Sequence, residues 1–142
     1  MTSDHDSPVP LDPRPGFRLA SPDDWLGLVR TRANVLITGP EDALAAFLTT
    51  AAAEWREPIG WVVCGQALPV ERLRTMILQD LQRLDDAGQQ ALWAWMNQPQ
   101  NADTQVVSVT YTPLFDLVQA NCFDRALYYR LNTIHLKAEP PG

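Results

Sequence analysis

Short apolar runs alternate along this chain with segments whose apolar residues recur at helical spacing. The runs predict strands at 34–38, 59–64, 76–80, 105–110 and 133–136. Helices are predicted over 40–56 and 85–97 and, as two short pieces, within 114–131, and a helical turn is predicted at 70–74. The strand runs suit burial on both faces, as in a parallel sheet. The alternation therefore predicts a three-layer α/β fold with a parallel sheet of about five strands and right-handed crossovers.

The same spacing predicts which side chains are buried. The stripe of the first helix is Leu44, Phe47, Leu48, Ala51 and Trp55, and that of the second is Leu84, Ala91, Leu92, Trp95 and Met96. Trp61 is also expected on a buried face. Trp93 lies off the stripe of its helix, and two interpretations stay open: an exposed interface anchor, or a side chain covered by a neighbouring loop. Tyr128 and Tyr129 are adjacent on a helix, so one of them is expected to face solvent or a partner.

Composition sets the domain organisation. The chain has 142 residues, of which 46% are hydrophobic, which suits one globular domain. Residues 1–16 are polar and acidic with four prolines, and we expect a disordered tail there. Residues 17–142 are predicted to form a single domain, and Ser21 is a plausible N-cap for a helix at its beginning.

The charge pattern argues against two classes of partner. The net charge is −6 and no basic run occurs, so direct binding to nucleic acid is not expected. No apolar stretch approaches the ~20 residues of a membrane span, and the N-terminus lacks a signal pattern. The sequence therefore predicts a cytoplasmic protein that does not associate with membranes.

Candidate chemistry is sparse. The two cysteines, Cys64 and Cys122, are interpreted as buried thiols, because they are too few for a disulfide scaffold or a zinc site even with His5 and His135. No Ser-His-Asp or Cys-His arrangement is suggested. We expect no metal and no catalytic residue.

Three strand ends are candidate ligand positions, since ligands of open parallel sheets collect at the carboxyl ends of strands. The positions are Gly39, Pro40, Glu41 and Asp42 after the first strand, Gln79 and Asp80 at the third, and Thr110 and Tyr111 at the fourth.

Five segments, in order, carry a resemblance to a known family. They are VLITG at 35–39, CGQALP at 64–69, MILQDL at 76–81, the helix at 85–96 and FDRALYYRLN at 123–132. They resemble the Walker A strand, the NCAALP segment, the LFLDEI Walker B strand, the LQAKLLRVLQ helix and the FREDLYYRLN segment of sigma-54-dependent transcriptional activators. The resemblance spans about 21–136 and implies an AAA+ core of the P-loop NTPase class.

The chain departs from this family where the phosphates would bind. A P-loop needs a second glycine and a lysine, because backbone amides cradle the phosphates and the lysine neutralises them. Here Gly39 is followed by Pro40, which has no N–H, and the only lysine is Lys137. Glu41 and Asp42 suit the capping of a helix and would repel a triphosphate.

The other family positions are also altered. The Asp-Glu pair of Walker B corresponds to Gln79 and Asp80, which leaves Asp80 as a water-binding or helix-capping remnant. Thr110 matches the sensor strand, but Tyr111 replaces the sensor asparagine. Of the two arginine-finger positions, the first is lost and the second is Arg130.

Arg130 has two interpretations. It could reach a nucleotide in a neighbouring subunit, but an ion pair with Asp124 or Asp80 is favoured. The sigma-contacting GAFTGA loop has no room in the short connection after Pro69. The family's helical lid and its DNA-binding helix-turn-helix are likewise expected to be absent.

These departures predict a non-catalytic domain and not an enzyme. The expected role is a protein-interaction or regulatory module linked to transcription, with an AAA+ subunit or a second copy as partner and Arg130, Trp93 and Tyr128 as candidate interface residues. No cofactor is expected. Two alternatives stay open: a regulatory domain with weak ATP or ADP binding but no hydrolysis, and a subunit that acts in trans within a larger AAA+ ATPase.

Overall fold

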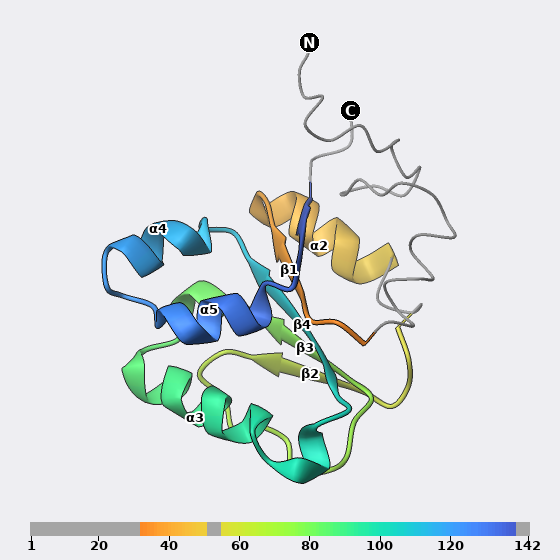
Figure 1. Cartoon of the computed structure of the whole chain (residues 1–142). Helices are drawn as coiled ribbons and strands as arrows, with labels where there is room; N and C mark the ends of the chain where they lie inside the picture. Colours follow the sequence, from red (N-terminus) through yellow and green to blue (C-terminus); the bar gives the residue numbers. More distant parts are fainter. Residues whose placement is uncertain (1–31, 51–54, 139–142) are drawn as a thin grey trace.

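A five-stranded parallel sheet forms the centre of the molecule. The computed structural model describes residues 32–50 and 55–138 (Figure 1). The strands are β1 Val35–Thr38, β2 Ile59–Val63, β3 Thr75–Gln79, β4 Gln105–Thr110 and β5 Ile134–Lys137. Their order is β2-β3-β4-β1-β5, and every pairing is parallel. The predicted sheet is confirmed, with each strand within one residue of its expected bounds.

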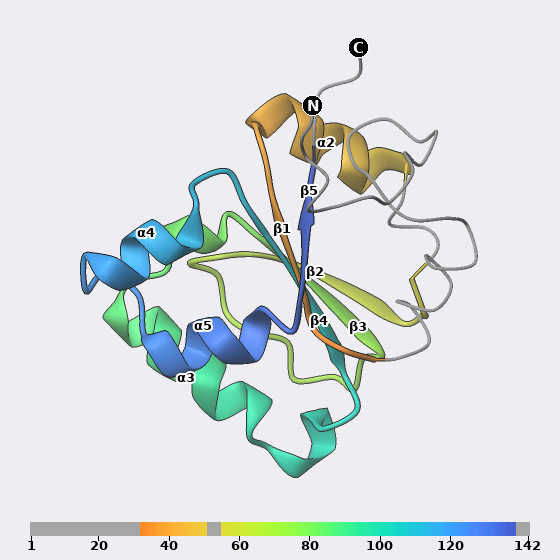
Figure 2. The ribbon, with the colours of Figure 1, turned by 45° about the horizontal axis from the view of Figure 1, so that its top comes forward.

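Helices cover both faces of this sheet. The helix α2, Glu41–Thr50, lies on one face, and α3 Asp86–Met96, α4 Leu114–Gln119 and α5 Arg125–Leu131 lie on the other (Figures 1 and 2). Two short 3-10 helices, η3 Leu81–Arg83 and η4 Pro99–Asn101, flank α3 in the chain. The helix α3 begins at Asp85, whose carboxylate accepts a hydrogen bond from the amide of Gly88 at 2.8 Å. The three-layer prediction is therefore confirmed.

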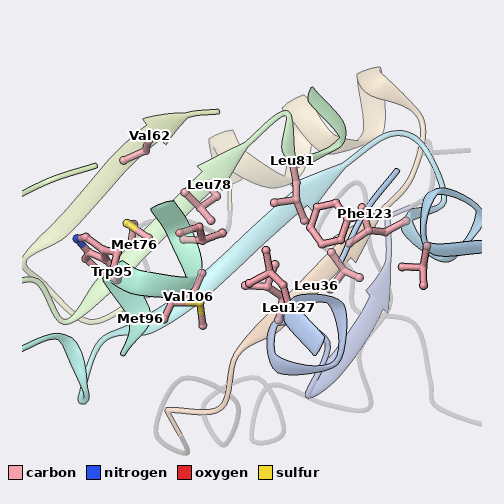
Figure 3. Close-up of a cluster of buried hydrophobic side chains, with 14 of the residues drawn as sticks. Leu36, Val62, Met76, Leu78, Leu81, Trp95, Met96, Val106, Phe123 and Leu127 are labelled. Atoms are coloured by element: carbon pink, nitrogen blue, oxygen red, sulfur yellow. The ribbon is translucent and has the colours of Figure 1, made fainter. Parts of the chain in front are cut away.

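The larger hydrophobic cluster lies between the sheet and α3, α4 and α5 (Figure 3). Successive residues of a strand face opposite sides of the sheet. Met76 and Leu78 accordingly join this cluster, and Ile77 between them joins the smaller cluster under α2. Burying one such side chain contributes about 1.5–3 kcal/mol. The continuous apolar strand runs thus serve two separate cores.

Several predictions of which side chains are buried were wrong. Trp61 is 48% exposed, because β2 is an edge strand and its side chain has no neighbouring strand to cover it. Ala91 and Cys122 are exposed as well, whereas Cys64 is half-buried. Residues 70–74 form no helical turn, since this connection runs directly into β3.

The first helix does not reach its predicted end at Arg56. Its described part is Glu41–Thr50, and Trp55 lies in a bend although its side chain is buried as expected. The predicted tail at 1–16, the helix at Ser21 and the side chain of Phe47 lie outside what the structure describes. No helix within 32–50 or 55–138 is long and apolar enough to cross a membrane.

Candidate functional site

The three predicted strand ends meet at the carboxyl edge of the sheet. Glu41 at the beginning of α2, Gln79 and Asp80 after β3, and Tyr111 after β4 line one small pocket. Its volume is about 140 Å³. Small-molecule sites commonly measure about 300–1,000 Å³, so this hollow is small for a nucleotide.

Gly39 is fixed by a close approach of two backbones. Its amide donates to the carbonyl of Thr110 at 3.3 Å. A Cβ at Gly39 would lie 2.3 Å from the carbonyl oxygen of Ala138, the residue after β5. Glycine is therefore required by packing at this strand end, and its amide is already engaged.

The connection from β1 to α2 consists of Gly39 and Pro40 alone. Pro40 has no amide hydrogen, and its carbonyl accepts from Leu44 at 3.0 Å as the helix begins. Asp42 accepts a hydrogen bond from the amide of Ala43 at 2.8 Å, which agrees with the capping interpretation. A two-residue connection of this kind has no ring of free amides to surround a phosphate.

Asp80 does not cap a helix with its side chain. Its backbone is in the left-handed region, with φ 61° and ψ 44°, immediately before η3. Only its carbonyl takes part in the turn, accepting from the amide of Arg83 at 2.9 Å. The interpretation of the Asp80 side chain as a helix cap is thus wrong. In its left-handed conformation this residue bonds to the turn through its backbone carbonyl alone.

Arg83 is a member of this site that sequence reasoning missed. Tyr111 beside its guanidinium, and secondarily the charges of Asp80 and Glu41, raise the pKa of Arg83. The available signal was an arginine three residues after the Walker B-like acid. The site therefore contains its own cation, supplied by η3.

Cys64 lies beside the same edge. Its amide donates to the carbonyl of Gln79 at 2.9 Å. Burial, and secondarily the charge of Asp80, raises the pKa of the Cys64 thiol to about 12. The thiol is protonated at neutral pH and is not an activated nucleophile.

Thr110, although it matches the sensor strand, is used for a local turn. Its hydroxyl donates to the carbonyl of Thr112 at 2.8 Å and accepts from the amide of Thr112 at 3.2 Å. Its side chain is fully buried.

Arg130 makes neither of the predicted ion pairs. Its guanidinium donates to the carbonyl of Met96 at 2.9 Å and to the side chain of Asn97, and lies 5.1 Å from the ring centre of Trp93. These partners surround the C-terminus of α3, where free carbonyls attract a cation. Asp124 instead accepts from the amide of Leu127 as the N-cap of α5.

Arg130 and Asp80 also lie at opposite edges of the sheet. The carbonyl of Arg130 accepts from Asn34, which precedes β1, at 2.9 Å. Asp80 instead follows the carboxyl end of β3. The ion pair expected between Arg130 and Asp80 therefore does not form.

The remaining interface candidates, Trp93 and Tyr128, lie on the face of the sheet that α3, α4 and α5 cover; this face is called the helical face below. Trp93 is 38% exposed, which agrees with the first of its two interpretations. Tyr128 is half-buried and its neighbour Tyr129 is 59% exposed. Phe115 of α4 packs against Tyr128, with ring centres 5.8 Å apart. Aromatic surface therefore extends across α4 and α5 beside the Trp93–Arg130 pair.

No group of three or more His, Cys, Asp or Glu side chains suited to a metal occurs within the part of the chain that the structure covers.

Comparison with known families gives one match, over residues 27–140, to the sigma-54 interaction domain. The chain belongs to this family. No curated protein sequence matches it.

Among solved structures, the chain is similar to NtrX from Brucella abortus in complex with ADP, with a TM-score of 0.55 and 15% identity over 86% of this chain and 37% of that one. NtrX in complex with ATP gives a TM-score of 0.53 and 14% identity, covering 85% and 38%. The chain thus spans little more than a third of these NtrX chains. At such identities the likeness shows the fold alone, a P-loop NTPase-like core.

Proposed function

We propose that this sigma-54 interaction domain has lost ATP turnover and acts as a non-catalytic protein-interaction module in transcription control. The observation that carries the proposal is the connection from β1 to α2. It consists of two residues, its glycine amide already has a backbone partner, and its proline has no amide hydrogen. A triphosphate would find neither the cradle nor the lysine that P-loop chemistry needs.

Electrostatics at the same edge supports this proposal. Glu41 and Asp80 line the pocket, and the nearby guanidinium of Arg83 lies in the field of these two carboxylates and of Tyr111. A nucleotide would bring further negative charge beside these carboxylates. Gln79, in the Walker B position, supplies no charge for Mg²⁺.

The helical face offers the surface that an interaction module needs. Exposed tryptophan, tyrosine and arginine side chains are common anchors of protein interfaces. Trp93 and Arg130 form one such pair, and Tyr129 and Phe115 expose aromatic area nearby. An AAA+ subunit or a second copy of this chain would be the partner.

The trans-acting alternative is less well supported. A finger must extend toward the neighbouring nucleotide. The guanidinium of Arg130 would first have to leave two hydrogen bonds and the ring of Trp93. Mixing the protein with a competent AAA+ ATPase separates an arginine finger from plain docking. If Arg130→Ala abolishes stimulation of the partner's ATPase rate while binding is retained, the finger is supported.

The decisive experiment is calorimetric titration with ATP and with ADP, each with Mg²⁺, up to millimolar ligand. We expect no saturable heat and no thermal stabilisation attributable to the carboxyl edge. Saturable binding tighter than about 1 mM, or about −4 kcal/mol, that is altered by Glu41→Gln would overturn the proposal and favour a regulatory nucleotide site.

The interaction role has its own measurement. Sedimentation of the full chain, alone and with an AAA+ ATPase of the activator type, should reveal a complex that Trp93→Ser weakens. A complex that Trp93→Ser leaves unchanged would remove this surface from the proposal, and a strictly monomeric, non-binding chain would remove the role.

A further inference from the structure

Three arginines lie just before strands begin, at the amino-terminal edge of the sheet. The candidate site at the carboxyl edge lies at the opposite ends of the strands. Arg32 precedes β1, Arg56 precedes β2 and Arg74 precedes β3. Because all strands are parallel, these three entry points share one edge. The chain is net acidic, so such a cluster is not explained by composition.

Hydrogen bonds tie the connections of Arg56 and Arg74 together. The hydroxyl of Thr75 donates to the carbonyl of Arg56 at 2.8 Å. The amide of Arg74 donates to the carbonyl of Pro58 at 3.0 Å, and its carbonyl accepts from the amide of Gln105 at 2.9 Å. The backbone at these two arginines is thus held to the neighbouring strand entries.

The guanidinium of Arg56 is unsatisfied. Its Nε and one terminal nitrogen, Nη2, are shut off from solvent and have no hydrogen-bond partner. Leaving buried donors without acceptors is unfavourable, and more so for a charged group. Burial, and then the charges of Arg32 and Arg74, lower the pKa of Arg56.

The counter-charge at this edge is incomplete. Among the described residues, Asp103 is the carboxylate whose charge acts on Arg56, and it lies 3.6 Å from the guanidinium of Arg32. Three guanidinium groups and one carboxylate leave a formal charge of +2. Arg32 and Arg74 are exposed, so the cluster is open to solution.

We propose that this amino-edge arginine cluster, Arg32, Arg56 and Arg74, binds a phosphate-type dianion, either free or carried by a partner. A tetrahedral oxyanion can accept from the exposed guanidinium forks of Arg32 and Arg74 at once, and its negative charge would stabilise the neighbouring charge of Arg56. The two negative charges of a phosphate dianion would balance the formal +2 of the cluster, whereas a ligand with a single carboxylate would leave one positive charge unbalanced. The proposal does not rest on the proposed function, because the two sites lie at opposite edges of the sheet.

The test is the melting temperature in phosphate-free buffer with increasing inorganic phosphate, at constant ionic strength maintained by chloride. We expect a saturable rise of roughly 5 °C for the full chain, since a ligand that binds only the folded state stabilises it. Acetate should give no comparable rise. An equal rise with acetate, or none with phosphate, would overturn the proposal.

Variants make the assignment specific. Arg56→Gln should abolish the response to phosphate while leaving the melting temperature in phosphate-free buffer unchanged or higher, because like-charge repulsion is relieved. Arg125→Gln, at an exposed position on α5, should keep the full response. A full response in Arg56→Gln counts against the cluster. If that variant does not fold, Arg74→Gln, at an exposed position, must reduce the rise in melting temperature with phosphate. An unchanged rise in Arg74→Gln would likewise count against the cluster.

Two further arms separate the source of the anion and the two sites. Phosphoserine that competes more strongly than inorganic phosphate would assign the site to a phosphorylated partner, and the reverse order would assign it to free phosphate.

Any ATP binding that is displaced by inorganic phosphate and lost in Arg56→Gln belongs to the amino edge. ATP binding that survives both belongs to the carboxyl edge and contradicts the proposed function alone.

Discussion

The two edges of the one sheet differ in the charge of the buried polar groups that lack a hydrogen-bond partner. At the carboxyl edge, the Gly39 amide has a backbone partner, and the buried atoms without one belong to the neutral side-chain amide of Gln82 in η3. At the amino edge, the buried nitrogens without a partner belong to the charged guanidinium of Arg56. Because a buried charged group without a partner costs more than a buried neutral amide, the amino edge is the stronger candidate for a ligand.

The largest expected effect concerns the thiols, and it tests how closed the carboxyl edge is. The thiolate fraction of Cys64 should be about a thousandfold below that of an ordinary cysteine, because its pKa is raised from 9.0 to about 12. Disulfide-exchange labelling of the native protein at pH 8 should modify the exposed Cys122 and spare Cys64. Equal labelling rates would show that this edge opens readily.

The same shift gives a pH dependence of stability. The folded pKa of the Cys64 thiol is raised, so its contribution is fully present below the unfolded pKa of 9.0 and is lost as the pH rises toward about 12. Chemical denaturation across this range should show a decline that Cys64→Ser reduces.

The next largest effect should follow from Gly39→Ala. The new Cβ would meet the backbone of Ala138, which cannot move as a side chain can, and we expect a loss of about 2–3 kcal/mol in the free energy of unfolding. Urea denaturation measures it. In the control Gly88→Ala the nearest atom is the flexible end of Leu84, and the loss should be clearly smaller. Comparable losses would mean that close packing does not explain Gly39.

A moderate effect is expected at the C-terminus of α3. Arg130→Ala removes hydrogen bonds to Met96 and Asn97 and the contact with Trp93, and should cost about 1–2 kcal/mol in unfolding free energy. Arg130→Lys should recover part of this loss because the charge near the helix C-terminus is kept. A neutral Arg130→Ala would instead favour a role for this residue in trans.

The smallest effect is expected for Arg83→Gln. Its guanidinium is exposed, so its contacts at the carboxyl edge are screened by water, and the midpoint of urea denaturation should stay close to that of the unchanged protein. The variant should not gain ATP binding, since Glu41 and Asp80 are then left without their nearby cation. A gain of binding would show that Arg83 itself had blocked a competent pocket.

Much of the fold could be predicted because its signals are local. The apolar runs at 34–38 and 105–110 can only be buried on both faces, and Asp85 placed the beginning of α3 correctly. Trp61 was misplaced because a periodic pattern does not reveal which strand lies at the edge. Gln89, buried and hydrogen-bonded to Leu84, Cys122 and Asp124, was not anticipated, since two of these three partners come from a distant segment.

The sequence by itself determined the class of fold, the family resemblance and the loss of the P-loop lysine, because these depend on residue identity and on spacing along the chain. Only the tertiary structure decided that Arg130 binds the end of α3, that Arg83 joins the carboxyl edge, and that three arginines share the amino edge. These contacts join residues far apart in the chain. Side-chain partners are chosen by distance and desolvation in three dimensions, which no local pattern records.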